Sequence, residues 1–353
     1  MTNICNIPHI RTINHQLDCS SFSNVKDLVT WMGAMQAQDY TMAKWAIGIR
    51  LNSNITDKEI EEVFNRGNIL RTHVMRPTWH FVPNEDIRWM LKLTGQRMKN
   101  SIGSYFKKEG ITAKLHLKIN NLIEKTLSGN NHSTRQEIES ILNKEGLLTH
   151  DHLMNGYVMY AEADGLICSG SVKAKKQTYA LMDERAPVTE DIHKEEALIK
   201  LATRYFKSHS PATLNDFVWW SGLSITESKQ AINLIKSELI TEKVNEVDFF
   251  IHESYKNDVI KSPKLHFLPA FDEYLISYKD RTSVLHLDHH PKAFNKNGTF
   301  YPVILCNGQI VGNWKKVAKG KQISFETIFF DKKIKTNKTQ IKEAEDRYRS
   351  FLS

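Results

Sequence analysis

Residues Ser210–Leu223 read SPATLNDFVWWSGL, and this stretch decides the fold that the sequence predicts. Its proline ends a preceding helix, which the apolar spacing places over residues 194–207. Thr213 and Asp216 then form a capping-box pattern for a short helix that ends at Gly222. Two helices with a tight connection are therefore expected on either side of the proline.

The residues after this stretch complete a recognisable unit. Ser224 and Glu227 form another capping-box pattern, for a helix that reaches about Leu239. Two strand-like runs follow, at residues 241–244 and 248–251, with a short polar turn between them. Three helices followed by a hairpin predict a winged helix-turn-helix.

A second copy of the same unit is expected earlier in the chain. Its predicted helices span 117–128, 133–144 (opened by a Ser133-x-x-Gln136 pattern) and 151–163, and its predicted strands span 166–169 and 177–182. The turn between the strands carries Lys173, Lys175 and Lys176. These lysines form either a basic wing tip that contacts a phosphate backbone or an ordinary solvated loop.

A third, looser copy is expected at the start of the chain, with a helix from Val25, a helix over 56–66 capped by Thr56 and Glu59, and a hairpin over 69–82. The predicted fold class is therefore α+β: three tandem winged helix-turn-helix units and a C-terminal β-rich region. The expected segments are 1–115, 116–187, 188–256 and 257–353.

One hairpin within the C-terminal segment has a strong turn signal. Asn307-Gly308 is typical of a type I′ turn and separates the apolar runs 303–305 and 310–312. Such a hairpin either inserts into a DNA groove or closes the C-terminal sheet.

Composition indicates which cellular compartment and which kinds of chemical site to expect. Of the 353 residues, 41% are hydrophobic and 25% charged, with no apolar run as long as a membrane span and no N-terminal leader pattern, so we expect a cytoplasmic monomer. The four cysteines are scattered, and His286, His289 and His290 precede a proline in a turn-like segment. We therefore expect no disulfide, no metal and no cofactor.

The net charge is +8, with a pI near 9.1. This balance suits a polyanionic partner, although many basic proteins bind none. Lysines crowd toward the C-terminal end, at positions 315, 316, 319, 321, 332, 333, 335 and 338.

The charges of the predicted recognition helix in the 188–256 unit argue against recognition of a specific base sequence. Its charged residues are Glu227, Lys229, Lys236 and Glu238, which cancel, whereas a helix in a DNA groove is usually basic. The aromatic residues of the preceding helix, Phe217, Trp219 and Trp220, are expected to pack in the core rather than stack on bases. The winged-helix fold is then a scaffold.

Residues Gln36–Asp39 (QAQD) follow an amphipathic helix with Ser23 as its expected N-cap and Gly33 near its end. If the chain is extended there, alternation turns Gln36 and Gln38 toward one side. An amide is a poor acid and a poor base, but it donates and accepts hydrogen bonds and so can orient a water molecule. Taken alone, two such glutamines are ordinarily solvated helix-end residues.

Four segments together carry a resemblance to a known family. They are Gln36–Asp39, Leu70–Val82 (LRTHVMRPTWHFV), Ser210–Leu223 and Leu268–Arg281 (LPAFDEYLISYKDR). In this order they resemble the AlkZ/YcaQ-like winged-helix DNA glycosylases, over nearly the whole chain. The resemblance implies a C-shaped protein whose concave channel holds double-stranded DNA, and an enzyme that removes alkylated purines.

The resemblance also implies roles for individual residues. The family motif is Q-x-Q in the AlkZ type and Q-x-D in the YcaQ type, so Gln36 and Gln38 are implied as the catalytic pair. Asp39 lies one position beyond the YcaQ carboxylate, which weighs against a YcaQ-like cross-link activity. Asp39 either supports a cationic sugar electrostatically or caps a helix or pairs with Lys44.

The hairpin of the second segment supplies further candidates. Arg71 and Arg76 are candidate phosphate or sugar contacts, and His80 is either a site residue or a hydrogen-bonded core histidine. We therefore predict a monofunctional DNA glycosylase acting on purines made cationic by alkylation at N3 or N7. The alternatives are a non-catalytic winged-helix DNA-binding protein or regulator, and a protein-interaction scaffold.

Overall fold

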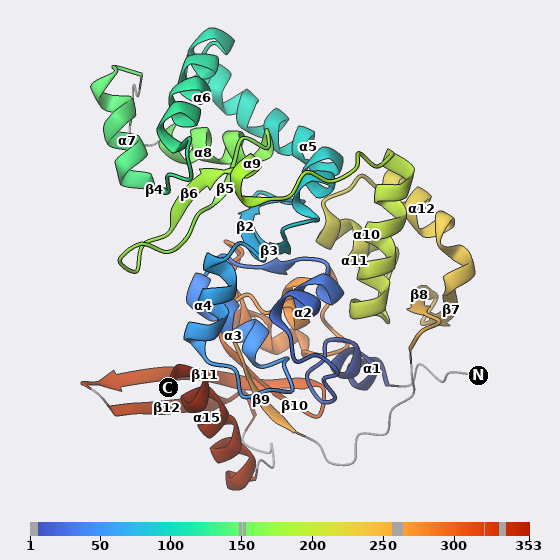
Figure 1. Cartoon of the computed structure of the whole chain (residues 1–353). Coiled ribbons are helices and arrows are strands. Elements are labelled where there is room, and N and C mark those ends of the chain that lie inside the picture. The colour runs from blue at the N-terminus through green and yellow to red at the C-terminus, as the bar shows by residue number, and fades with distance from the viewer. Residues whose placement is uncertain (1–5, 148–149, 151–152, 256–263, 321, 332–336) are drawn as a thin grey trace. The chain divides into compact units, whose positions relative to one another are not determined.

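The computed structural model describes residues 6–147, 150, 153–255, 264–320, 322–331 and 337–353 (Figure 1). The chain forms two compact units: residues 1–60 with 198–353, and residues 61–197. Helices α4 (Asp57–Asn65) and α10 (Lys194–His209) run across the two points of division. The boundary expected at 256/257 lies outside the described residues, and the other expected boundaries stay predictions.

The first unit contains a four-stranded antiparallel sheet in the order β12-β11-β10-β9. Its strands are β9 (Leu265–Leu268), β10 (Val303–Cys306), β11 (Gln309–Lys319) and β12 (Gln322–Phe329). Its helices are α1 (Ile7–Asn14), α2 (Val25–Met32), α3 (Tyr40–Gly48), α11 (Leu214–Ser221), α12 (Ile225–Leu234), α13 (Glu273–Ile276), α14 (His290–Ala293) and α15 (Lys338–Leu352).

The turn Asn307-Gly308 joins β10 and β11 with both residues in the left-handed conformation, at φ 52° and 75°, as the sequence predicts. It is packed inside the unit, because a Cβ at Gly308 would lie 2.6 Å from the Cβ of Pro8. The hydroxyl of Tyr274 also donates to the Gly308 carbonyl, at 2.8 Å. Of the two roles expected for this hairpin, the packing favours closing the sheet.

The elements around Ser210–Leu223 occur in the predicted order. Capping boxes open α11 at Thr213 and α12 at Ser224, and the hairpin β7 (Leu239–Val244) and β8 (Val247–His252) follows. Helix α12 ends at Leu234, earlier than predicted, and a 3-10 turn over Lys236–Glu238 leads into β7. Phe217 and Trp220 are fully buried, as predicted, whereas Trp219 is only partly buried and its indole N–H donates to the Ile276 carbonyl at 2.7 Å.

The C-terminal segment is not purely β-rich, because it ends in the helix α15. The buried residues of α15 are Ala344, Tyr348 and Phe351, spaced so that they share one face. Tyr348 and Phe351 pack on Trp45 of α3, with ring centroids 4.8 and 5.1 Å apart. Helix α15 therefore supports α3, which begins directly after the QAQD segment.

The second unit has a hairpin β2 (Ile69–His73) and β3 (Trp79–Pro83) and a sheet in the order β4-β6-β5. Its other elements are α5 (Ile87–Lys108), α6 (Ala113–Leu127), β4 (Ser133–Thr134), α7 (Arg135–Lys144), α8 (Met154–Ala163), β5 (Ile167–Ser169), β6 (Thr178–Leu181) and α9 (Met182–Arg185). The long helix α5 was not predicted.

One local prediction for this unit needs correction. The capping box of α7 uses Thr134 and Glu137, not Ser133 and Gln136, because the glutamate accepts from the Thr134 backbone N–H at 2.7 Å. Helix α8 begins at Met154, and residues 151 and 152 of the predicted helix lie outside the described residues. The buried faces of α5, α6, α7 and α8 form one apolar core.

Among the described residues, no helix combines the length and the apolar character that crossing a membrane requires.

Candidate active site

The QAQD segment lies between two helices whose ends are well defined. Asn24, rather than the predicted Ser23, caps α2 by accepting from two backbone N–H groups, and α2 ends at Met32 with Gly33 as its C-cap. Gly33 has φ +78°, a conformation that favours glycine. The chain then runs through the two-residue strand β1 (Met35–Gln36) into α3. The segment is thus a short, sharply bounded link.

The two glutamines differ in exposure, which strict alternation does not predict. Gln36 is 5% exposed and Ala37 is fully buried, whereas Gln38 and Asp39 are exposed. The reason is that the extended stretch ends at Gln36, and the chain turns toward α3 before a second pair of alternating residues is completed. That both amides face one space stays a prediction.

Asp39 has the capping role that was one of its two expected interpretations. Its Oδ1 accepts from the backbone N–H of Met42 at 3.0 Å and so caps α3. The Lys44 ammonium group lies 2.7 Å from the Asp57 carboxylate. A carboxylate at a helix N-terminus is stabilised by the helix dipole, which is sufficient reason for an acid here.

A buried carboxylate from another part of the unit meets the start of the segment. The backbone N–H of Gln36 donates to Oε1 of Glu273, at 2.5 Å, and the Ser277 hydroxyl donates to Oε2. His209 Nε2 lies 3.7 Å from the same oxygen. Burial alone raises the pKa of Glu273, but His209 and the hydrogen bonds from Ser277 and Gln36 outweigh it and lower the pKa to about 2. The group is therefore a carboxylate at neutral pH.

The residue before it holds the other end of α3. Asp272 accepts from both terminal nitrogens of Arg50, at 2.7 and 2.8 Å, and both side chains are fully shielded from solvent. Arg50 lies just after α3 and also donates to the Ala46 carbonyl inside that helix. Two consecutive acids, the first residue of α13 and its N-cap, therefore bind residues on the two flanks of α3.

The candidate DNA contacts Arg71 and Arg76 lie in the second unit. The Arg71 guanidinium lies 4.3 Å from the Trp79 ring centroid, and its backbone N–H donates to Ser169 Oγ at 2.8 Å. Ser169 ends β5, so Arg71 lies at the root of the β5–β6 hairpin. Arg76 lies on the tight turn between β2 and β3, directly after Met75 at φ 64°.

Both histidines of this hairpin are buried. His80 is fully buried. His73 Nδ1 makes a short hydrogen bond to the fully buried Glu162, and its ring packs against Trp79 with centroids 4.4 Å apart. The burial of His80 agrees with a place in the core, and its hydrogen bonding stays a prediction.

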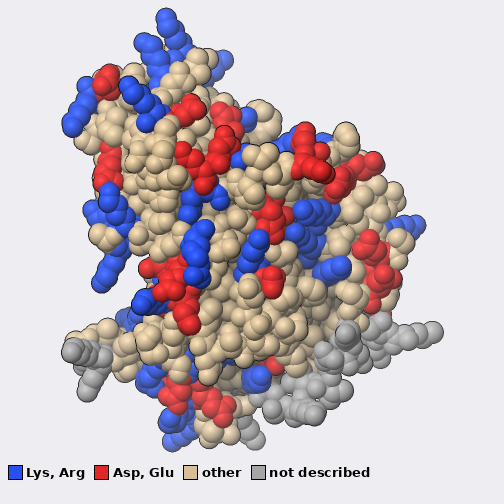
Figure 2. All heavy atoms as spheres, in the orientation of Figure 1, with Lys and Arg blue, Asp and Glu red and all other residues tan. Residues whose placement is uncertain are grey.

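The predicted wing lysines lie at the tip of the β5–β6 hairpin. Lys173 and Lys176 exchange two backbone hydrogen bonds of 2.9 Å, and the two residues between them, Ala174 and Lys175, both have positive φ. This is the geometry of a type I′ turn. All three lysines are exposed, and blue spheres cluster at this tip in Figure 2. Lys173 lies 3.4 Å from the Glu137 carboxylate.

The C-terminal lysines are only partly described. Lys315 and Lys316 lie on β11, in the first unit. Lys321, Lys332, Lys333 and Lys335 lie outside the described residues.

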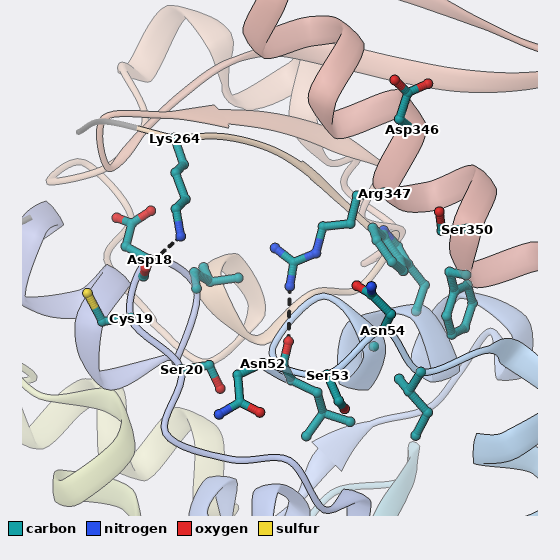
Figure 3. Close-up of a pocket in the computed structure, with 16 residues that line it drawn as sticks. Asp18, Cys19, Ser20, Asn52, Ser53, Asn54, Lys264, Asp346, Arg347 and Ser350 are labelled. Carbon is teal, nitrogen blue, oxygen red and sulfur yellow. Dashed lines mark hydrogen bonds between the residues drawn. The ribbon is translucent and has the colours of Figure 1, made fainter. Parts of the chain in front are cut away.

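A pocket of about 590 Å³ in the first unit is lined by residues outside the QAQD segment, among them Asp18, Asn52 and Arg347 (Figure 3). The cations that line it are bound to the protein itself: Lys264 donates to the Asp18 carbonyl at 2.9 Å, and Arg347 donates to the Ile49 and Leu51 carbonyls at 2.8 and 3.2 Å. The bonds from Arg347 tie α15 to the end of α3.

Comparison with known proteins shows the family to which the chain belongs. The family model described as DNA glycosylase AlkZ-like matches residues 29–351. The chain belongs to this family. An interstrand DNA cross-link repair glycosylase from Streptomyces sahachiroi is 23% identical over 313 residues, which cover 83% of this chain and 82% of that protein. The solved structure of S. sahachiroi DNA glycosylase AlkZ has the same fold, with a TM-score of 0.81, 18% identity and coverage of 98% and 95% of the two chains.

In this AlkZ-like chain the sequence identified the glutamine motif but not its support. Glu273 lies within Leu268–Arg281, yet an acid at the start of a short helix is ordinarily a capping residue. Its contact with Gln36 joins residues 237 positions apart, and local spacing gives no signal for such a pair. The role of Arg50 is not predictable from the sequence for the same reason, because its partner Asp272 is 222 positions away.

Proposed function

We propose that this protein is a monofunctional DNA glycosylase that hydrolyses the N-glycosidic bond of alkylated, cationic purines in duplex DNA. The observation that supports it best is the Gln36-x-Gln38 motif of an AlkZ-like chain, held at a helix start by the buried hydrogen bond from Gln36 to Glu273 and by the Asp39 cap of α3. Gln36 and Gln38 are the proposed catalytic residues. The three helix–hairpin segments are proposed winged helices that line a DNA channel.

The chemistry requires little proton transfer. Alkylation at N3 or N7 makes the purine cationic, so when the bond from C1′ to N9 breaks, its electron pair neutralises the base. The sugar is left as an oxocarbenium-like cation, and water adds to C1′ and releases a proton to solvent. Amide groups that orient this water suffice, and such positioning is worth about 10²-fold or more.

The two amides are suited to different parts of this task. Gln36 is nearly buried and anchored through its backbone, so its position is set before DNA binds. We assign it the orientation of the attacking water. Gln38 is exposed, which suits contact with the sugar or with the water from the DNA side. Asp39 adds a negative charge next to both, in support of the cationic sugar.

Contacts with DNA are proposed to come from cations on the second unit. Arg71 and Arg76 of the β2–β3 hairpin and the exposed lysines 173, 175 and 176 at the β5–β6 tip are the candidates. Phosphate contacts of this kind fix position without reading sequence, so binding is expected to depend steeply on salt and weakly on sequence.

The direct test is base release. The purified protein is incubated with a duplex that contains 7-methylguanine, with and without EDTA, and free base and abasic DNA are measured. Release of 7-methylguanine, unchanged by EDTA, supports a metal-independent glycosylase. Tight binding without release supports the non-catalytic regulator, and weak binding that does not respond to salt supports the interaction scaffold.

Unhooking of interstrand cross-links is a second candidate function. It is favoured by the cross-link repair glycosylase from S. sahachiroi, which matches most of this chain. A duplex cross-linked through N7 of two guanines provides the test, because unhooking separates the strands on a denaturing gel. Release of 7-methylguanine without strand separation would restrict the function to simple adducts.

A further inference from the structure

Glu273 is a carboxylate where a charge is costly. The side chain is 1% exposed, and a buried charge is tolerated only where hydrogen bonds or opposite charges compensate its loss of water. Both oxygens are engaged: Oε1 accepts from the Gln36 backbone N–H, and Oε2 accepts from the Ser277 hydroxyl and faces His209. One of these partners belongs to the proposed catalytic residue.

The backbone N–H of Gln36 needs such an acceptor. A buried N–H without an acceptor is destabilising, so a bond from it to a fixed carboxylate defines where the backbone of Gln36 lies. Hydrogen bonds to a charged acceptor are also stronger than those between neutral groups. The position of Glu273 is itself fixed, because Asp272 beside it is held by Arg50.

We propose that Glu273 is a positioning residue for base excision, which acts through Gln36 by holding the backbone of the Q-x-Q motif. This inference rests on the proposed function. Glu273 does not contact DNA in this scheme, because its side chain is buried and its oxygens are used inside the protein. Its contribution is the placement of the Gln36 amide relative to C1′, where errors of about 1 Å cost up to ~10²-fold in rate.

The test uses single-turnover excision with DNA saturating, in full-length protein. Glu273→Ala removes the acceptor, and we expect the rate to fall by at least about 10-fold with unchanged affinity for undamaged duplex. Glu273→Gln retains an oxygen that can accept from Gln36, and we expect a rate within a few-fold of wild type. Glu273→Asp keeps the charge, but its side chain is one methylene too short to reach the Gln36 backbone N–H, so its excision rate should resemble that of Glu273→Ala. It takes the place of the alanine variant in the test if that variant does not fold.

A double-mutant cycle shows whether Glu273 acts through Gln36. In a Gln36→Ala background, the change at Glu273 should cause little further loss, because the group that it positions is gone. Asp18→Asn is the matched control: Asp18 is another buried carboxylate of the same unit, paired with His266 at 2.8 Å. We expect it to lower thermal stability and leave the excision rate unchanged.

The outcomes separate the inference from the function on which it rests. A wild-type rate in Gln36→Ala would overturn the proposed function. A slow Gln36→Ala together with a wild-type rate in Glu273→Ala or Glu273→Asp would overturn the positioning role alone. Full additivity in the cycle, or an equal loss of rate in Asp18→Asn, would also overturn it, because the effect would then come from general destabilisation.

Discussion

Gly33 packs directly against the indole of Trp220. A Cβ at this glycine would lie 3.3 Å from Cη2 of Trp220 and 3.4 Å from Cβ of Arg204. Gly33 also has φ +78°, so both the backbone and the space around it disfavour a side chain. This contact places the end of α2 against the aromatic core and fixes where the chain enters the QAQD segment.

Gly33→Ala is therefore expected to destabilise the protein by about 1–3 kcal/mol, the usual cost of a residue held in an unfavourable backbone region. Chemical denaturation measures the change. Gly103→Ala is the matched control, because Gly103 lies inside α5 and a Cβ there would project into open space. That substitution should be neutral or stabilising by up to ~1 kcal/mol. Equal stability of Gly33→Ala and wild type would contradict the strain argument.

Gln36→Ala and Gln38→Ala should each slow base excision by roughly 10²-fold, about 2.7 kcal/mol of transition-state stabilisation. Single-turnover rates with saturating DNA are the measurement, and affinity for undamaged duplex should change little. Gln38→Glu should show reduced but detectable activity, because a carboxylate stabilises the cationic sugar and misplaces the water. Wild-type rates in both alanine variants would remove the glutamines from the mechanism.

Two substitutions at Asp39 separate its capping role from an electrostatic one. Asp39→Asn keeps an oxygen that caps α3 and removes the charge, so it should retain stability and lower the excision rate if the charge assists the sugar. Asp39→Ala removes both and should cost about 1 kcal/mol of stability in addition. An unchanged rate in Asp39→Asn would leave Asp39 as a helix cap only.

Replacing Lys173, Lys175 and Lys176 by alanine should reduce the slope of log affinity against log salt by about 0.9 for each lysine that contacts a phosphate. Lys173 should contribute least, because it lies 3.4 Å from Glu137. The control replaces Lys292, Lys296 and Lys342, which are also exposed, lie outside the three helix–hairpin segments and remove the same charge from the first unit. Equal slopes in the two triple variants would exclude a specific role for the wing.

Stability in acid should depend on Glu273. Its folded-state pKa of about 2 lies below its ordinary value of 4.5, so its stabilising contribution is complete above pH 4.5 and is lost as the pH falls toward 2. The unfolding free energy of wild type should fall more steeply across this window than that of Glu273→Gln, because this variant has no carboxylate to protonate at position 273. Parallel curves for the two proteins would show that Glu273 is not a stabilised carboxylate.

The sequence predicted elements where the signal is local. The capping boxes at Thr213 and Ser224 and the Asn307-Gly308 turn all depend on residues within a few positions of one another, and all occur in the structure. Helices α5 and α15 were missed. Helix α15 has a clear apolar spacing at Ala344, Tyr348 and Phe351, but the C-terminal segment was expected to be β-rich.

The candidate site was predictable only in part. The family motif points to Gln36 and Gln38. The side-chain alternation of an extended chain does not predict their exposures, because β1 is only two residues long. The partners of the segment, Glu273 and the Asp272–Arg50 pair, come from distant parts of the chain. Contacts of this kind depend on tertiary packing, which no local pattern encodes.

Because two adjacent acids, Asp272 and Glu273, bind residues on either side of α3, the fold constrains the number of residues between Gln36 and Arg50. Glu273 and Asp272 are consecutive residues, so their carboxylates lie near each other. The chain from residue 36 to residue 50 must therefore connect these two anchor points through a helix of fixed length. One inserted residue would rotate every following α3 side chain by about 100° and detach one of the two anchors. Insertions and deletions in related chains should accordingly spare this interval and accumulate in loops outside it.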